Sequence, residues 1–166
     1  IEQIIMSAQG RPKVVVAGAG GAIGTVVSRD LAREYDIIAL VGSQDQMQET
    51  EPGLSLSWRS CEPFSRQDVE KAINGCDYII YLVHTRVPTA RLDQAECEDM
   101  DLLIADNVAR AASLEGIKQI IYLGSLIPKG NISSGFLKRH NEVIEALSNY
   151  GTPLTVLRAG LVVAPG

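Results

Sequence analysis

A run of β-branched residues passes directly into a glycine-rich turn near the start of the chain. The sequence from 14 to 24 is Val-Val-Val-Ala-Gly-Ala-Gly-Gly-Ala-Ile-Gly, and a segment with helical apolar spacing follows. This order predicts a buried strand, a tight turn and a helix whose first backbone N–H groups point at a pyrophosphate. An ordinary strand–helix turn is the alternative, because glycine-rich turns are common, but the strand before and the helix after favour nucleotide binding.

Each glycine in this turn has its own expected role. Gly18 permits the turn, Gly20 and Gly21 let phosphate oxygens approach the backbone, and Gly24 lets the helix lie close to the sheet. The residues expected to bind the phosphates are Gly18, Gly20, Gly21, Ala22, Ile23 and Gly24.

The rest of the chain alternates short apolar runs with segments of helical periodicity. Strands are expected at residues 13–17, 36–41, 54–59, 77–83, 117–123 and 153–157, and helices at 22–34, 66–74, 98–115 and 136–150. Regular alternation implies a parallel sheet joined by right-handed crossovers and covered on both faces. The predicted fold class is therefore α/β, a doubly wound Rossmann sheet of six strands in the order 3-2-1-4-5-6.

Composition sets the domain count and excludes several partners. The chain has 166 residues, 46% of them hydrophobic, which suffices for one core. Residues 1–12 are expected to be a leader or tag remnant, and residues 13–166 a single dinucleotide-binding domain. A net charge of −5 argues against nucleic acid and against an anionic membrane surface as partners. No apolar run approaches the roughly 20 residues that span a bilayer.

Cysteine usage indicates a reducing compartment. Cys61, Cys76 and Cys97 are odd in number and lack C-x-x-C spacing, so neither a disulfide framework nor a metal site is expected. A cytoplasmic location follows as the prediction. Long irregular segments at 84–94 and 125–135 follow the fourth and fifth expected strands. Loops at the carboxyl ends of parallel strands are where such folds bind their ligands.

Several segments together resemble the short-chain dehydrogenase/reductase superfamily, in its extended or atypical NmrA-like branches, which include nucleotide-sugar epimerase-like proteins. The resemblance covers residues 13–166. Its carriers are the segments 17–24, 75–83, 106–112, 121–125 and 157–166. It implies a nicotinamide dinucleotide, NAD(P), as cofactor and an unknown small molecule as substrate.

The superfamily uses a catalytic serine, tyrosine and lysine, the last two in a Y-x-x-x-K motif. The tyrosine exchanges a proton with the substrate, and the lysine lowers its pKa and holds the nicotinamide ribose. The resemblance places the serine at Ser125 and the lysine at Lys138, but the tyrosine position is Ser134. A serine hydroxyl is much less acidic than a phenol, so the main acid–base group is missing. An exposed helix lysine is the alternative for Lys138.

Two histidines are further candidates. His140 lies two residues past Lys138, on a different helical face, so we expect a solvated surface histidine rather than a substitute for the tyrosine. His84 directly follows the fourth expected strand, where the cofactor ribose or the substrate would lie. Ligand contact and a purely structural loop role remain equal alternatives for His84.

The remaining expected cofactor contacts also come from the resemblance. Gly42 and Ser43 end the second strand region, where this branch often carries arginine, and Asp45 lies further on than the usual NAD-binding acid. Because the sequence has neither the arginine nor the acid at the usual position, the resemblance alone decides, and it favours NADP. Further expected contacts are Cys61 and Glu62 near the adenine, Val83 and His84 after the fourth strand, and Ala159 and Gly160 after the sixth. An exposed loop glutamate is the alternative for Glu62.

Two classes of function follow. The first is an oxidoreductase or epimerase-like enzyme in which Ser125, with His84 as a further candidate, polarises the substrate oxygen. The second is a non-catalytic, NmrA-like dinucleotide-binding redox sensor, which the missing tyrosine favours; a domain that serves only in assembly is a third alternative. Related enzymes place part of the substrate pocket in a lobe after the sixth strand, so we expect these residues to be part of a longer protein. Relatives often pair through the helices expected at 98–115 and 136–150, which suggests a homodimer.

Overall fold

The computed structural model describes residues 10–84, 94–126 and 135–160, which fold around one parallel sheet. The strand order is β3-β2-β1-β4-β5-β6, as predicted. The strands are β1 (Lys13–Ala17), β2 (Asp36–Val41), β3 (Leu56–Ser60), β4 (Tyr78–Tyr81), β5 (Gln119–Ser125) and β6 (Leu154–Ala159). All five neighbouring pairs are parallel, so every strand ends at the same edge of the sheet.

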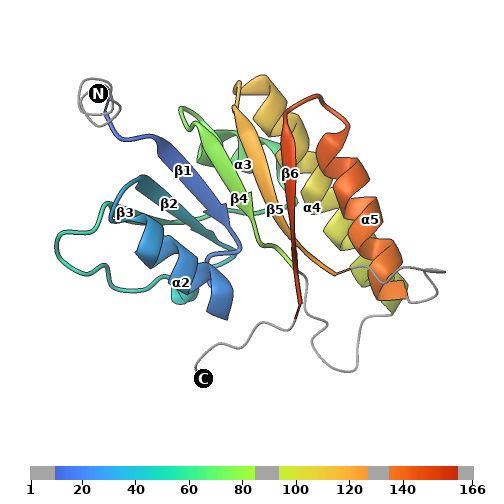
Figure 1. Ribbon diagram of the computed structural model, residues 1–166, viewed down its shortest axis with the longest axis horizontal. Helices are drawn as coiled ribbons and strands as arrows, with labels where there is room; N and C mark the ends of the chain where they lie inside the picture. The colour runs from blue at the N-terminus through green and yellow to red at the C-terminus, as the bar shows by residue number, and fades with distance from the viewer. Residues whose placement is uncertain (1–9, 85–93, 127–134, 161–166) are drawn as a thin grey trace.

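Helices cover the two faces of the sheet unequally. The α-helices are α2 (Ala22–Leu31), α3 (Arg66–Ile73), α4 (Gln94–Leu114) and α5 (Gly135–Ser148), and a short 3-10 helix, η1 (Gln44–Gln46), follows β2. Figure 1 shows α2 alone on one face, beside β1 to β3, with α3, α4 and α5 on the other. The predicted alternation of strands and helices is confirmed.

Alternating side chains of strand β1 point into two separate hydrophobic cores. In β1, Val15 faces the larger core, which α3, α4 and α5 complete, while Val14 and Val16 face the smaller core on the α2 side. All three valines are at most 5% exposed. A strand covered on both faces has no need for polar residues, which explains the unbroken apolar run in the sequence.

Some element boundaries differ from those predicted. Strand β5 continues two residues further, through Gly124 and Ser125, because β6 pairs with it as far as Ser125 opposite Ala159. Helix α4 begins at Gln94 rather than at 98, and residues 94–97 are mostly good helix formers. The segment after β2, expected to be loop, contains η1. No helix within the described ranges is long and apolar enough to cross a membrane.

Candidate dinucleotide and substrate site

A cavity of about 650 Å³ lies at the edge of the sheet where the strands end. It begins at the glycine turn, passes the ends of β2 and β4 and reaches β5 at Leu123. Most of the predicted cofactor residues line it. These are Gly18, Gly20, Gly21, Ala22, Ile23, Gly24, Gly42, Cys61, Val83 and His84.

The glycine turn is as compact as a phosphate-binding turn must be. Gly18 has a φ of 87°, and a Cβ there would lie 2.9 Å from the backbone of Leu82. A Cβ on Gly24 would lie 2.3 Å from the Gly18 carbonyl oxygen, so only glycine lets α2 approach the turn this closely. Gly20 and Gly21 are exposed and leave their side of the turn open to a ligand. The expected steric roles of Gly18 and Gly24 agree with these contacts, and phosphate binding at Gly20 and Gly21 stays a prediction.

The amino terminus of α2 is equipped for an anion. The first helical hydrogen bond runs from the Thr25 N–H to the Gly21 carbonyl, which leaves the N–H groups of Ala22, Ile23 and Gly24 without acceptors inside the helix. The first turn carries no acidic side chain. Free N–H groups and the helix dipole therefore act together on a bound phosphate, so the residues present fit a dinucleotide.

The end of β2 carries a residue that the sequence did not single out. Gln46, in η1, accepts a hydrogen bond from the Gly42 N–H through its Oε1 at 3.1 Å and lines the cavity beside Gly20. A lone glutamine five residues past the end of a strand gives no pattern that would mark it. Ser43 is exposed and precedes η1 at its N-cap position without a side-chain capping hydrogen bond, and it is not part of the cavity lining.

The loop after β3 forms another wall through Cys61, Pro63 and Phe64. Burial, reinforced by the charges of Asp68 and Glu62, raises the pKa of Cys61 to about 11, so the thiol stays protonated and acts as apolar wall. The Glu62 carboxylate is exposed and accepts the Phe64 N–H through Oε1 at 3.3 Å.

Asn107 of α4 holds this loop in place. Its side chain is 2% exposed, and Nδ2 donates to the Pro63 carbonyl at 3.0 Å and to the Phe64 carbonyl at 3.2 Å. The resemblance included residues 106–112 as a segment without giving Asn107 a role. The sequence signal that could have identified Asn107 is a polar residue on an otherwise apolar helix face.

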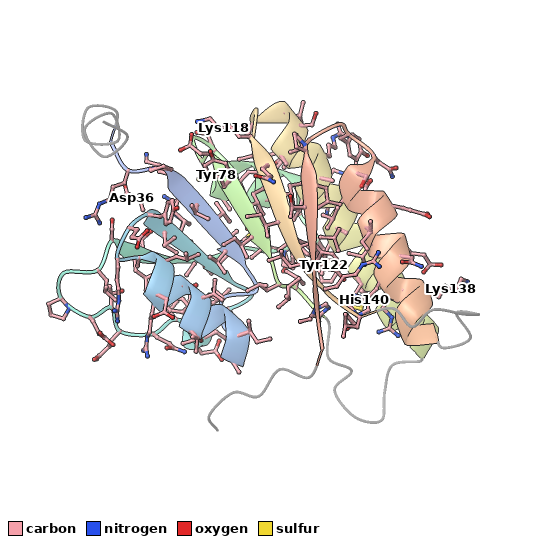
Figure 2. All side chains as sticks on the ribbon, in the orientation of Figure 1. Asp36, Tyr78, Lys118, Tyr122, Lys138 and His140 are labelled. Atoms are coloured by element: carbon pink, nitrogen blue, oxygen red, sulfur yellow. The ribbon has the colours of Figure 1, made fainter. Side chains whose placement is uncertain are left out.

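A hydrogen-bonded cluster lies between β5 and α5. Ser125 Oγ is 3.2 Å from Nε2 of His140, and the other ring nitrogen, Nδ1, is hydrogen-bonded to the Tyr122 hydroxyl. Figure 2 shows Tyr122 and His140 meeting between the strand and the helix. His140 is 6% exposed, so the expected surface histidine is wrong. The reason is helical register, because residue 140 precedes Val143, Ile144 and Leu147 on the face of α5 that packs against the sheet.

His84 links this cluster to the cavity. Its ring lines the cavity and lies 5.5 Å, centroid to centroid, from the ring of His140 and 6.3 Å from that of Tyr122. Desolvation lowers the pKa of both histidines, and the buried carboxylate of Asp101 opposes the shift. Burial raises the pKa of Tyr122, so the phenol stays neutral.

Other predicted residues lie outside the cavity lining. The Lys138 ammonium is 3.5 Å from Glu142 Oε1, its side chain is 76% exposed, and Figure 2 shows it extending outward from α5. Ala159 ends β6 opposite Ser125, with Gly160 directly after it. Ser134 lies outside the described residues. Ser125 itself lies at the end of β5, within reach of His140 rather than in the wall of the cavity.

Comparison with known proteins agrees with this geometry. The model of a family described as NAD(P)H-binding matches residues 18–161. Auxiliary protein GraX of Staphylococcus aureus is 29% identical over 145 residues, which are 87% of this chain and 43% of GraX. The chain thus spans less than half of that relative.

Solved structures share the fold at low identity. WbmH of Bordetella bronchiseptica, in complex with NAD⁺, superposes with a TM-score of 0.71 at 14% identity over 90% of this chain and 56% of WbmH. Triphenylmethane reductase of Citrobacter sp., complexed with NADP(H), gives 0.70 at 22% identity over 89% of this chain and 49% of the reductase. A nucleoside-diphosphate-sugar epimerase of S. aureus gives 0.71 at 18% identity, covering 88% and 50% of the two chains. At these identities the likeness shows the fold alone.

Proposed function

The chain belongs to the NAD(P)H-binding family, and from that premise we propose that it is the dinucleotide-binding part of an oxidoreductase or nucleotide-sugar epimerase-like enzyme of the extended short-chain dehydrogenase type. One observation carries this proposal. The cavity that starts at the glycine turn is also lined by His84, whose ring lies 5.5 Å, centroid to centroid, from that of the His140 bonded to Ser125. A phosphate-binding turn and a cluster able to hold a proton thus lie on one edge of one sheet.

The chain's own residues would divide the work of binding. The glycine turn and the free N–H groups of Ala22, Ile23 and Gly24 would hold the pyrophosphate. Cys61 and Phe64 would contact the adenine, and Val83 and His84 the nicotinamide half. When bound, the nicotinamide would supply or accept a hydride. Ser125 would hold the substrate oxygen through its hydroxyl.

We propose NADP(H) as the preferred form. NAD-specific sites hold the ribose 2′-OH with a carboxylate after the second strand. Here the described residues that line the cavity beside Gly42 include the neutral Gln46 and no carboxylate. The nearby Asp45 is exposed and lies in η1. Arg29 of α2 bonds Gln48 close by and is a candidate partner for a 2′-phosphate.

A second function rests on Lys138 and Ser134. The lysine pairs with Glu142 at the surface, and the tyrosine position holds a serine. A protein that binds NAD(P)(H) and reports its redox state to a partner, without turnover, would need neither residue. Such an NmrA-like sensor is the alternative to the enzyme.

Calorimetric titration with NAD, NADH, NADP and NADPH tests dinucleotide binding. A matched pair of variants at Gly21 tests the site, because a Cβ there meets only ordinary contacts, at 3.6 Å from the Gly18 carbonyl oxygen. Aspartate and asparagine are equally good helix N-caps, but only aspartate adds a negative charge. We expect Gly21→Asp to weaken binding at least tenfold more than Gly21→Asn. No binding of any dinucleotide to the wild-type protein would overturn the proposal.

Hydride transfer separates the enzyme from the sensor. Labelled NADPH is incubated with the full-length protein and a pool of carbonyl compounds, and transfer of label to carbon is measured. Transfer supports the enzyme. Tight binding with no transfer supports the sensor and contradicts the oxidoreductase.

A further inference from the structure

His140 lies where it can accept a proton from Ser125. Its Nε2 is 3.2 Å from the serine Oγ, and its Nδ1 is hydrogen-bonded to the Tyr122 hydroxyl. The ring is 6% exposed, so bulk water competes little for either nitrogen. A hydroxyl next to a histidine that a third group orients is the arrangement by which proteins activate a weakly acidic hydroxyl.

We propose that His140, oriented by Tyr122, is the base for the Ser125 hydroxyl and thereby replaces the acid–base capacity that Ser134 lacks at the tyrosine position. The substrate part of this inference rests on the proposed function and concerns an alcohol and its carbonyl product. His140 acts on the substrate only through Ser125, so it is a positioning residue, whereas Ser125 touches the reacting oxygen.

In the direction of alcohol oxidation, one proton and one hydride leave the substrate. The substrate O–H gives its proton to Ser125 Oγ, and the serine proton passes to Nε2 of neutral His140. The substrate C–H bond breaks with both electrons leaving as hydride, for which oxidised NAD(P) is the acceptor. The products would be a carbonyl compound, an intact serine, a His140 imidazolium and the reduced dinucleotide. In the reverse direction the imidazolium returns the proton through Ser125.

This scheme requires one particular tautomer. Nε2 can accept a proton only if neutral His140 carries its proton on Nδ1, donated to the Tyr122 oxygen. Burial raises the pKa of Tyr122, so the phenol stays neutral and its oxygen can accept the hydrogen bond from Nδ1–H. Burial, with smaller contributions from His84 and Arg139, lowers the pKa of His140, so the ring is neutral near pH 7.

Charged and titratable groups surround His140 from each neighbouring element. His84 faces it from the end of β4, Tyr122 and Ser125 from β5, Asp101 from α4 and Arg139 from its own helix. Asp101 alone among them favours the imidazolium. Its carboxylate is 4% exposed and would stabilise the charge that His140 gains during the transfer.

Nitrogen-15 NMR of the cofactor-free protein tests the tautomer directly, with His140→Gln used for assignment. We expect the Nδ1–H form and a pKa below 6.5. A neutral ring protonated on Nε2 overturns the proposal, because that nitrogen would then have no lone pair for the serine proton.

Labelling with diisopropyl fluorophosphate tests activation of the serine without any substrate. The Ser125 oxygen bonds to phosphorus, fluoride leaves, and the serine proton goes to His140. We expect labelling at Ser125 at least tenfold faster in the wild type than in His140→Gln, and slower below the His140 pKa. Equal rates, or no labelling of Ser125, overturn the proposal.

Two variants act as controls for these rates. Glu145→Gln, at an exposed position of α5, should label like the wild type. Tyr122→Phe removes only the hydroxyl and should slow labelling severalfold, with a mixture of tautomers by NMR. Neither measurement involves a dinucleotide, so their failure leaves NAD(P) binding standing, and a failure of NAD(P) binding leaves the Ser125–His140 pair standing.

Discussion

Gly24 is required by the distance between α2 and the turn that precedes it. Alanine there would place a Cβ 2.3 Å from the Gly18 carbonyl oxygen and 2.7 Å from the Ala19 Cα, both backbone atoms. We expect Gly24→Ala to lower the free energy of unfolding by about 2 kcal/mol, as overpacking typically does, despite the better helix propensity of alanine. Thermal unfolding should show a Tm lower by about 4–8 °C.

Gly20→Ala provides the matched control in the same turn. Its Cβ would meet only ordinary contacts, 3.4 Å from a methyl group of Val41. We expect its Tm to stay within about 2 °C of the wild type. A Tm for Gly24→Ala that equals that of Gly20→Ala would show that α2 can move away from the turn.

Single residues also show where the sequence was informative. The glycine turn was predicted residue by residue, because spacing along the chain fixes a local turn. The spacing from Lys138 wrongly predicted a surface position for His140. The spacing from Val143 and Leu147 would have placed it on the helix face that packs against the sheet. The contact of His140 with Tyr122 joins residues 18 apart in the chain, and no local pattern encodes it.

Between elements, Asn107 ties α4 to the loop after β3. Its amide donates to two carbonyl groups, and truncation would leave both without this donor at a partly buried place. We expect Asn107→Ala to cost about 2 kcal/mol of stability. NADPH affinity, measured by calorimetry, should fall about fivefold because Pro63 and Phe64 line the cavity. Asn149→Ala, at an exposed site, should change neither quantity.

Asp77 joins the beginnings of three strands. Its carboxylate accepts from the Lys118 ammonium at 2.7 Å and from the Lys13 N–H at 2.9 Å. These two bonds, that of Lys118 first, lower the pKa of Asp77. The folded state therefore holds the ionised form more firmly than the unfolded chain does. The resulting stability is present above about pH 4 and is lost as the pH falls through the lowered pKa.

Asp77→Asn removes this charge and tests the pH dependence. We expect its Tm at pH 7 to be lower by about 1–3 °C, a small effect because the pair is solvent-screened. The difference from the wild type should be constant between pH 5 and 8 and should shrink below pH 4. A difference that persists unchanged at pH 3 would contradict the ionic origin.

Elements as units were predictable, whereas their ends were not. The alternation of apolar periods identified every strand and every α-helix that the structure describes, but not the 3-10 helix η1. The end of β5 depends on how far β6 pairs with it, and α4 extends back to Gln94 through residues that are mostly good helix formers. The boundary of β5 is therefore set by a tertiary contact that no local pattern encodes.

At the scale of the whole molecule, the strand order followed from chirality and alternation, but the cavity did not. Its walls come from β1, α2, the ends of β2 and β4, the loop after β3, α3, α4 and β5. These segments are far apart in the chain and meet only because parallel strands end at one edge. The sequence predicted which edge would bind and many of the residues on it. Only the fold shows that the cavity is also lined by Gln46, Phe64 and Met100.

A site assembled from so many segments exists only in the folded chain, so a ligand bound there must stabilise the whole domain. Ligand present at a hundred times its dissociation constant adds about 2.7 kcal/mol to the free energy of unfolding. For a chain of this size we expect NADPH at that concentration to raise the Tm by about 5–10 °C. Gly21→Asn should retain most of this shift, and Gly21→Asp should lose it at the same NADPH concentration, because a carboxylate then faces the phosphates. An equal rise in both variants would place the dinucleotide away from the glycine turn.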